Sequence, residues 1–150
     1  RRWPHMVPRS EKPYRRPCSR FFIRRLSSGR LLMINHYKFS HRIDLDDIMR
    51  QGNVKRWQGR SHLTAMLSED DGATWPYTLL LDERDEVSYP DAKEADDGYI
   101  YVTYDHQRVT KREILMARFT EQDILAGRLQ SSRSTLRILV NKALGQPDIH

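Results

Sequence analysis

The eight residues 68–75, which read Ser-Glu-Asp-Asp-Gly-Ala-Thr-Trp, constrain the fold of this chain more than any other stretch. The glycine allows a backbone conformation that side chains disfavour, and the first aspartate can accept hydrogen bonds from the amides of a tight turn. The serine and the threonine can tie two strands together, and the tryptophan is expected to pack beneath them. The pattern therefore predicts a hairpin that is fastened at five positions: Ser68, Asp70, Gly72, Thr74 and Trp75.

The rest of the chain alternates short apolar or β-branched runs with glycine-containing turns, a pattern typical of antiparallel sheets. Two of these turns, Ser27–Gly29 and Asp96–Gly98, align with one another, and each continues into further strands. A repeated four-stranded unit of about 40–50 residues is typical of a propeller blade, although a generic antiparallel sheet would contain the same strands. The strands are expected at residues 21–23, 31–37, 61–67, 74–81, 87–92, 99–104, 113–119 and 136–140.

Two segments interrupt the strand pattern with helical signals. Residues 120–127 begin with a threonine suited to an N-cap, carry acids in the first turn and end at a glycine, which predicts one or two helical turns. Residues 41–60 mix apolar and acidic residues before a glycine, which suggests a short helix on an excursion from the sheet. Residues 1–19, rich in proline and arginine, are expected to form a leader or the remnant of an earlier blade, ahead of a domain that spans 20–150.

The net charge of +6 is distributed unevenly, because residues 1–60 hold 16 basic and 4 acidic residues whereas residues 61–150 hold 10 and 16. A basic half can indicate nucleic-acid binding, but these arginines are scattered among prolines and no nucleic-acid motif is present. The single cysteine, Cys18, has neither a disulfide partner nor metal-ligand spacing around it, so no metal or cofactor is predicted. No apolar run approaches the roughly 18–20 residues that span a bilayer, and no secretory signal is recognised, which leaves the compartment open.

The stretch 68–75 fits the Asp-box pattern at all five fixed positions. Together with residues 60–68 before it and 87–91 after it, it resembles the late blades of the sialidase (neuraminidase) superfamily, including bacterial sialidase-like proteins with BNR repeats; the resemblance covers residues 20–127. It implies an all-β, six-bladed β-propeller of four-stranded antiparallel sheets, with its site at the centre of one face. At about 40–50 residues a blade, the chain is expected to supply two to three C-terminal blades, with the remaining blades missing from it.

Several residues match functional positions of that superfamily. Arg60 matches the third arginine of the triad that clamps the sialic-acid carboxylate, and a guanidinium fork suits this task. Tyr89 matches the nucleophilic tyrosine, which a glutamate activates in the family because a phenol with a pKa of about 10 is a weak nucleophile. Asp105 matches a glutamate that supports the first arginine of the triad. Asp91 and Arg108 are expected to help line the pocket.

The chain departs from the family at two positions. Arg20 or Ser19 stands where the family has the activating glutamate, and an arginine cannot act as a base toward the phenol. His36 stands where the family has the second triad arginine, whose charge a histidine replaces only in part. His36 still counts, with Arg60 and Arg108, among the basic residues that would suit an anionic ligand.

The resemblance implies that the parent protein is an exo-acting glycoside hydrolase for sialic acid or another acidic sugar, with this chain inactive alone. The alternative is a non-catalytic propeller that binds carbohydrate or protein, which the missing glutamate and arginine favour. A basic module for nucleic acid is a third alternative. The partner expected from the sequence is an anionic glycan, rather than a nucleic acid or a membrane.

Overall fold

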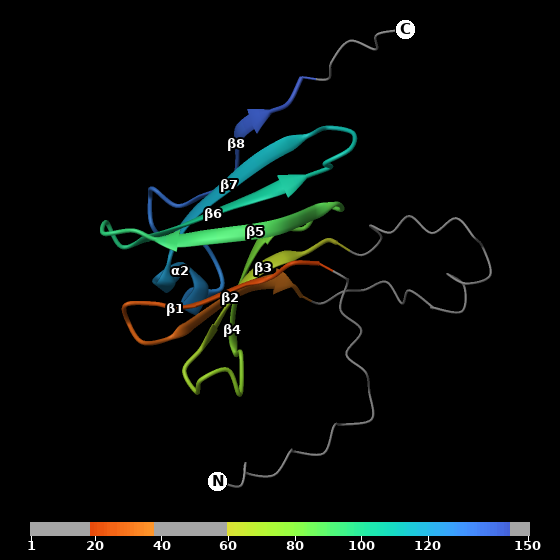
Figure 1. The fold of residues 1–150 in the computed structure, drawn as a ribbon. Helices are drawn as coiled ribbons and strands as arrows, with labels where there is room; N and C mark the ends of the chain where they lie inside the picture. The colour runs from red at the N-terminus through yellow and green to blue at the C-terminus, as the bar shows by residue number, and fades with distance from the viewer. Residues whose placement is uncertain (1–18, 38–59, 145–150) are drawn as a thin grey trace, which may run out of the picture.

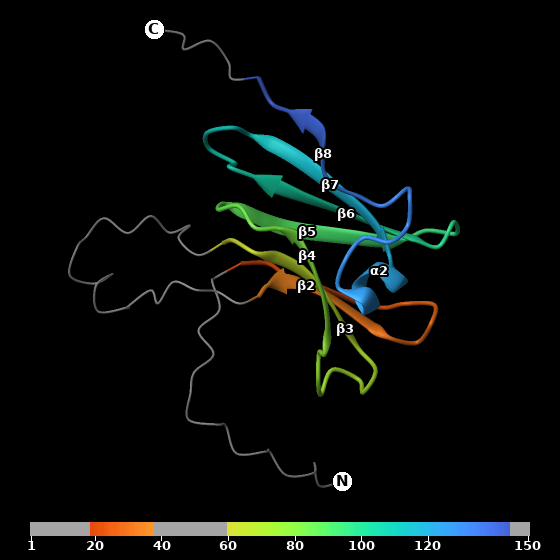
Figure 2. The ribbon, with the colours of Figure 1, turned by 180° about the vertical axis from the view of Figure 1, so that it is seen from behind.

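The computed structural model describes residues 19–37 and 60–144 of the chain. These residues form two four-stranded antiparallel sheets, with the orders β1-β2-β3-β4 and β5-β6-β7-β8, and one short helix (Figures 1 and 2). The elements are β1 (Phe22–Arg25), β2 (Leu31–His36), β3 (Leu63–Ser68), β4 (Tyr77–Asp82), β5 (Val87–Glu94), β6 (Tyr99–His106), β7 (Glu113–Thr120), α2 (Glu121–Ala126) and β8 (Thr135–Lys142).

This architecture confirms the all-β fold class. In each sheet the strands that are consecutive in the chain are also neighbours in space, and neither sheet closes on itself, which is consistent with two blades of a β-propeller. The helix expected within residues 41–60 and the leader up to residue 18 lie outside the described residues. None of the described helices is long and apolar enough to cross a membrane.

One hydrophobic core lies between the two sheets. Because successive side chains of a strand point to opposite faces, alternate residues of the facing strands meet in this core. The buried core side chains are Leu26, Leu32, Ile34, Leu63, Ala65, Leu67, Leu79, Leu81, Val87, Ile100, Val102, Tyr104, Leu115, Ala117, Phe119 and Ile124.

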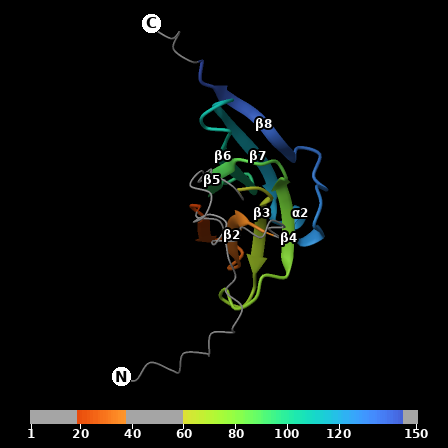
Figure 3. The same cartoon turned by 90° about the vertical axis from the view of Figure 1, so that its right-hand side faces the viewer.

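The helix α2 forms where the sequence predicts it and closes the rim of the core. Thr120 is its N-cap and forms a capping box with Asp123, while Gly127 ends it in the left-handed conformation at φ +68°. Ile124 is buried in the core, and the helix lies alongside β4 of the other sheet (Figure 3). The connection from β7 to β8 therefore packs the second sheet against the first.

Two strand boundaries differ from the expectation. The fourth strand begins at Tyr77 instead of residue 74, because the indole of Trp75 folds back onto the turn and Pro76 has no amide hydrogen for a ladder bond. The last strand runs from Thr135 to Lys142 and is longer than expected. It pairs with β7 through two irregularities of register, and Arg137 takes a positive φ of 56° at one of them.

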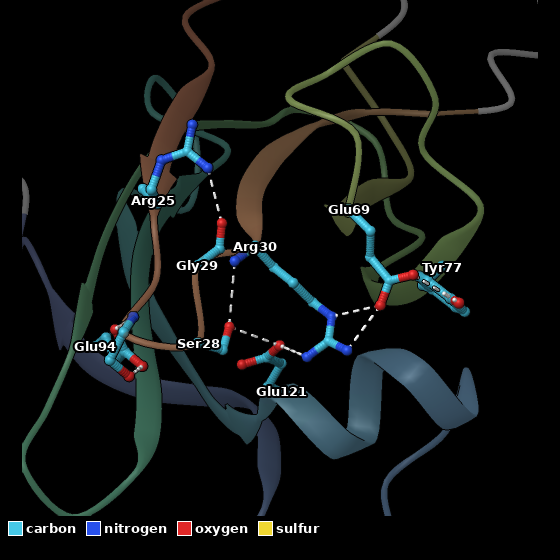
Figure 4. Close-up of polar contacts among 9 residues, drawn as sticks. Arg25, Ser28, Gly29, Arg30, Glu69, Tyr77, Glu94 and Glu121 are labelled. Atoms are coloured by element: carbon cyan, nitrogen blue, oxygen red, sulfur yellow. Dashed lines mark hydrogen bonds and ion pairs between the residues drawn. The ribbon is translucent and has the colours of Figure 1, made fainter.

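A polar network joins the two sheets at the rim, around Arg30 (Figure 4). The guanidinium of Arg30 contacts Glu69 of the first sheet's Asp-box turn at 2.7 Å and Glu121 of α2 at 2.7 Å. In the same region the backbone amide and hydroxyl of Ser27 donate to the carboxylate of Glu94, at the end of β5, at 2.8 and 2.5 Å. The turn between β1 and β2 is thus fastened to both the helix and the second sheet.

A second connection between the sheets is buried. The phenol of Tyr104 in β6 donates a hydrogen bond of 3.0 Å to Asp82 at the end of β4. Burial opposes ionisation of Asp82, but the hydrogen bonds from Arg84 outweigh burial and keep the pKa of this carboxyl below its ordinary value. Asp82 therefore stays a charged acceptor on which β6 and the β4–β5 connection converge.

Candidate functional site

The Asp-box turn between β3 and β4 is organised around one carboxylate. Asp70 accepts hydrogen bonds from the amide of Thr74 at 2.8 Å and from its hydroxyl at 2.6 Å. Ser68 donates its hydroxyl to Asp70 at 2.7 Å and accepts the amide of Gly72 at 2.8 Å. These bonds, led by the hydroxyl of Thr74, lower the pKa of Asp70 to about 2.

The two remaining Asp-box residues complete the turn. Gly72 has a φ of +92°, which side chains rarely adopt, and its carbonyl accepts the indole N–H of Trp75 at 3.1 Å. Trp75 is half-buried against the turn, where its ring lies 3.5 Å from the position that a Cβ on Gly72 would take. The turn is a structural fastener, because its five fixed residues are engaged with one another.

Tyr89 projects from a β-bulge at the start of β5. The register between β5 and β6 shifts between the pair Ser88–Asp105 and the pair Asp91–Thr103, so that one extra residue lies on β5. Tyr89 lies inside this bulge with a φ of +54°, and it remains 39% exposed. A bulge and a left-handed tyrosine re-aim one side chain and occur often beside functional sites.

Two arginines approach the ring of Tyr89. The guanidinium carbon of Arg60, which precedes β3, lies 5.5 Å from the ring centroid, and that of Arg108, in the turn after β6, lies 4.5 Å from it. Both distances are within the range of a cation–π contact. Arg60 is buried, with 7% of its surface exposed, whereas the side chain of Arg108 is half exposed.

Asp105, the last residue but one of β6, holds one of these arginines. Its Oδ2 lies 3.0 Å from Nε of Arg108, and its Oδ1 accepts the hydroxyl of Ser88 at 2.5 Å. Burial raises the pKa of Asp105 above its ordinary value, although Ser88, Arg108 and Arg60 act in the opposite direction. We call Arg60, Ser88, Tyr89, Asp105 and Arg108 the Tyr89 cluster.

His36 lies behind the cluster, at the end of β2. It is buried and its Nε2 donates to the carbonyl of Val87 at 2.8 Å, whereas its Nδ1 is buried and finds no hydrogen-bond partner among the described residues. Burial lowers the pKa of His36, and the charge of Arg60 lowers it further. Through the hydrogen bond from Nε2 to Val87, the imidazole ties β2 to the start of β5.

The remaining expected residues form no hydrogen bond or ion pair with the Tyr89 cluster among the described residues. Asp91 is exposed on β5, and its carboxylate accepts the amide of the adjacent Ala92 at 3.0 Å. Arg20 is exposed ahead of β1, and Ser19 donates its hydroxyl to the carbonyl of Arg20 at 3.4 Å. Ser88 belongs to the cluster but was missed from the sequence, since only the pairing of β5 with β6 brings it to Asp105.

The cluster has the chemistry of an anion site. Two guanidiniums against one carboxyl group give it a net positive charge, and guanidinium donors match the geometry of carboxylates and other oxyanions. The hydroxyl of Tyr89 is hydrogen-bonded to no described residue, so no base is attached to it in residues 19–37 and 60–144. Within those residues no group of three or more His, Cys, Asp or Glu side chains is arranged to hold a metal ion.

A family model described as a BNR repeat-like domain matches residues 13–102, which is more than half of the chain. The matched region contains the Asp box, Arg60 and Tyr89, and ends before Asp105 and Arg108. No curated protein and no solved structure matches the chain significantly. The chain therefore belongs to the BNR repeat-like family and is a sialidase-like BNR repeat protein.

Proposed function

We propose that the Tyr89 cluster forms part of a binding site for an acidic sugar, and that the parent protein is a sialidase-like exo-glycoside hydrolase. The observation that carries this proposal is the approach of two guanidiniums, from Arg60 and Arg108, to the ring of one accessible tyrosine. They come from separate segments of the chain, before β3 and after β6. This gathering of positive charge around one tyrosine supports the proposal of an anionic sugar as the ligand.

The burial of Arg60 favours its role as the carboxylate clamp. A guanidinium with 7% exposure lies in a medium of lower dielectric than water, where its attraction to an anion is stronger. Arg108 is more exposed and its charge is shared with Asp105 at 3.0 Å. We therefore assign the stronger contact with the sugar carboxylate to Arg60 and a supporting contact to Arg108.

Hydrolysis would use Tyr89 as the nucleophile. A tyrosine avoids the repulsion that a carboxylate would meet at an anionic sugar, and sialidases are exceptions to the two-carboxylate rule for this reason. The 39% exposure of Tyr89 leaves it reachable from solvent. Because its hydroxyl is bonded to no described residue, the activating base and the acid must come from other parts of the protein.

A second candidate is a propeller that binds acidic glycans without cleaving them. Asp105 is the carboxylate of the Tyr89 cluster, and both of its oxygens are already engaged, by Ser88 and by Arg108. A carboxylate held in this way supports an arginine and is not available as a base for Tyr89. This arrangement favours binding over hydrolysis if the other blades supply no glutamate.

One experiment separates the two candidates. The full-length protein and its Tyr89→Phe variant are assayed for release of 4-methylumbelliferone from its α-sialoside, and for binding of α2,3-sialyllactose. A hydrolase loses turnover in the variant and keeps binding, whereas a binding protein shows binding without turnover in both. The proposal would be overturned if the protein neither cleaved nor bound any of the sialosides, glucuronides and sulfated sugars tested.

A further inference from the structure

We infer that Ser88 is a positioning residue: through Asp105 its hydroxyl holds Arg108 on the ring of Tyr89, and Arg108 held there favours anionic over neutral ligands. The part concerning ligands rests on the proposed function, whereas the part concerning position does not. Neither Ser88 nor its bond to Asp105 follows from the family resemblance. The inference rests on three contacts, from Ser88 to Asp105, from Asp105 to Arg108 and from Arg108 to Tyr89. Because Tyr89 follows Ser88 in the chain, these contacts close a ring of four residues.

The first contact is the cross-strand pair of Ser88 and Asp105. These residues are register partners in β5 and β6, and the hydroxyl of Ser88 donates to Oδ1 of Asp105 at 2.5 Å. Ser88 is 2% exposed, so water does not compete for this hydroxyl. A short bond from a buried donor to a carboxylate fixes the rotation of that carboxylate.

The second contact uses the other oxygen of the same carboxylate. Oδ2 of Asp105 lies 3.0 Å from Nε of Arg108, three residues later. The side chain of Arg108 is half exposed, and without this contact it would sample many rotamers in water. Since Oδ1 is occupied by Ser88, Oδ2 is the oxygen presented to Arg108, and the direction of the guanidinium is set.

The third contact returns to β5. The guanidinium of Arg108 lies 4.5 Å from the ring centroid of Tyr89, the neighbour of Ser88. In a regular strand neighbouring residues point to opposite faces, so Ser88 and Tyr89 would not serve one cluster. The bulge and the φ of +54° at Tyr89 remove this restriction. The ring of Tyr89 therefore contacts Arg108, which Ser88 holds through Asp105.

The test begins with a measurement that needs no ligand. In NMR spectra of the full-length protein, a guanidinium held on an aromatic ring shows side-chain protons shifted upfield by the ring current. We expect this shift for Arg108 in the wild type, and its loss in Ser88→Ala and in Asp105→Asn. The second variant keeps an acceptor for Ser88 but presents no carboxylate to Arg108.

Ser27→Ala is a matched control. Ser27 also donates its hydroxyl to a carboxylate at 2.5 Å, that of Glu94, but at the rim of the sheets and outside the Tyr89 cluster. This variant should leave the Arg108 signals unchanged. The positioning role is overturned if Arg108 keeps its upfield shift in either Ser88→Ala or Asp105→Asn, or if Ser27→Ala abolishes the shift as well.

The second measurement compares α2,3-sialyllactose with lactose. In Ser88→Ala the side chain of Arg108 is free and must be ordered again when the ligand binds. The affinity for sialyllactose should therefore fall about threefold to tenfold, and the affinity for lactose should not change. Equal losses for the two sugars, or no loss, would overturn the role of Arg108 in ligand preference. If the wild type binds no acidic sugar, the proposed function fails, while the NMR result still decides the positioning of Arg108.

Discussion

The phenol of Tyr104 and the carboxylate of Asp82 are hydrogen-bonded at 3.0 Å across the two sheets, and both side chains are buried. This bond joins the outermost strand of the first sheet to the second strand of the next one. Asp82 also accepts three bonds from Arg84, which lies in the connection that leads into β5. The position of β5, and therefore of Tyr89, depends on this buried acceptor.

Tyr104→Phe should destabilise the fold. It removes a donor from a buried charged acceptor, which costs about 1–3 kcal/mol of unfolding free energy. Urea denaturation of the full-length protein measures the loss. Tyr101→Phe is the matched control, because its hydroxyl donates to Asp97 at the same 3.0 Å in an exposed position and should cost much less. Equal losses for the two variants would contradict the role assigned to burial.

The Asp box should give a pH-dependent contribution to stability. Because the pKa of Asp70 is lowered to about 2 in the fold, its contribution is complete above the unfolded value of about 3.9 and is lost as the pH falls toward 2. The Tm difference between the wild type and Asp70→Asn should therefore be largest near neutral pH and shrink below about pH 4.

Asp96→Asn provides the comparison for that prediction. Asp96 lies in the glycine turn between β5 and β6, and its side chain makes no hydrogen bond or ion pair with the described residues. Its replacement should change Tm little at any pH. A Tm difference for Asp70→Asn that stays constant from pH 6 to pH 3 would show that the carboxylate is not what fastens the turn.

His36 should carry a proton on Nε2, and its burial should make a second protonation harder than in the unfolded chain. Since burial lowers its pKa, the unfolded chain takes up a proton as the pH falls below about 6.5, and the folded chain takes one up only at a lower pH. Stability from His36 is thus present above this pH and declines below it. The Tm advantage of the wild type over His36→Gln should be larger at pH 8 than at pH 5.5. A titration midpoint of His36 at or above pH 6.5 in ¹⁵N spectra of the folded protein would contradict this.

Much of the fold follows from local sequence signals. The Asp-box residues form their turn because each needs only neighbours within the same eight residues. The helix after Thr120 forms for the same reason, since its capping box and its closing glycine are local. Strand ends are less local, and β4 begins later than expected because Trp75 bonds to the turn before it.

The site depends on contacts that the sequence does not reveal. Ser88 reaches Asp105 through strand pairing, and the bulge that releases Tyr89 has no clear signature in Val-Ser-Tyr-Pro. His36 stands where the family has an arginine, and its hydrogen bond to the carbonyl of Val87 supports the start of β5. The family resemblance predicts Arg60, Tyr89 and Asp105 as site residues. The contact between Asp105 and Arg108 that orients this arginine is visible only in the structure.

The most direct test of the acidic-sugar site is the affinity of the full-length protein for α2,3-sialyllactose, by titration calorimetry at low salt. Arg60→Gln removes a charge-assisted contact and should weaken binding about tenfold to a hundredfold, while Arg25→Gln, an exposed arginine paired with Asp71 at the rim, should leave it unchanged. Equal affinities for the wild type and Arg60→Gln would contradict the site.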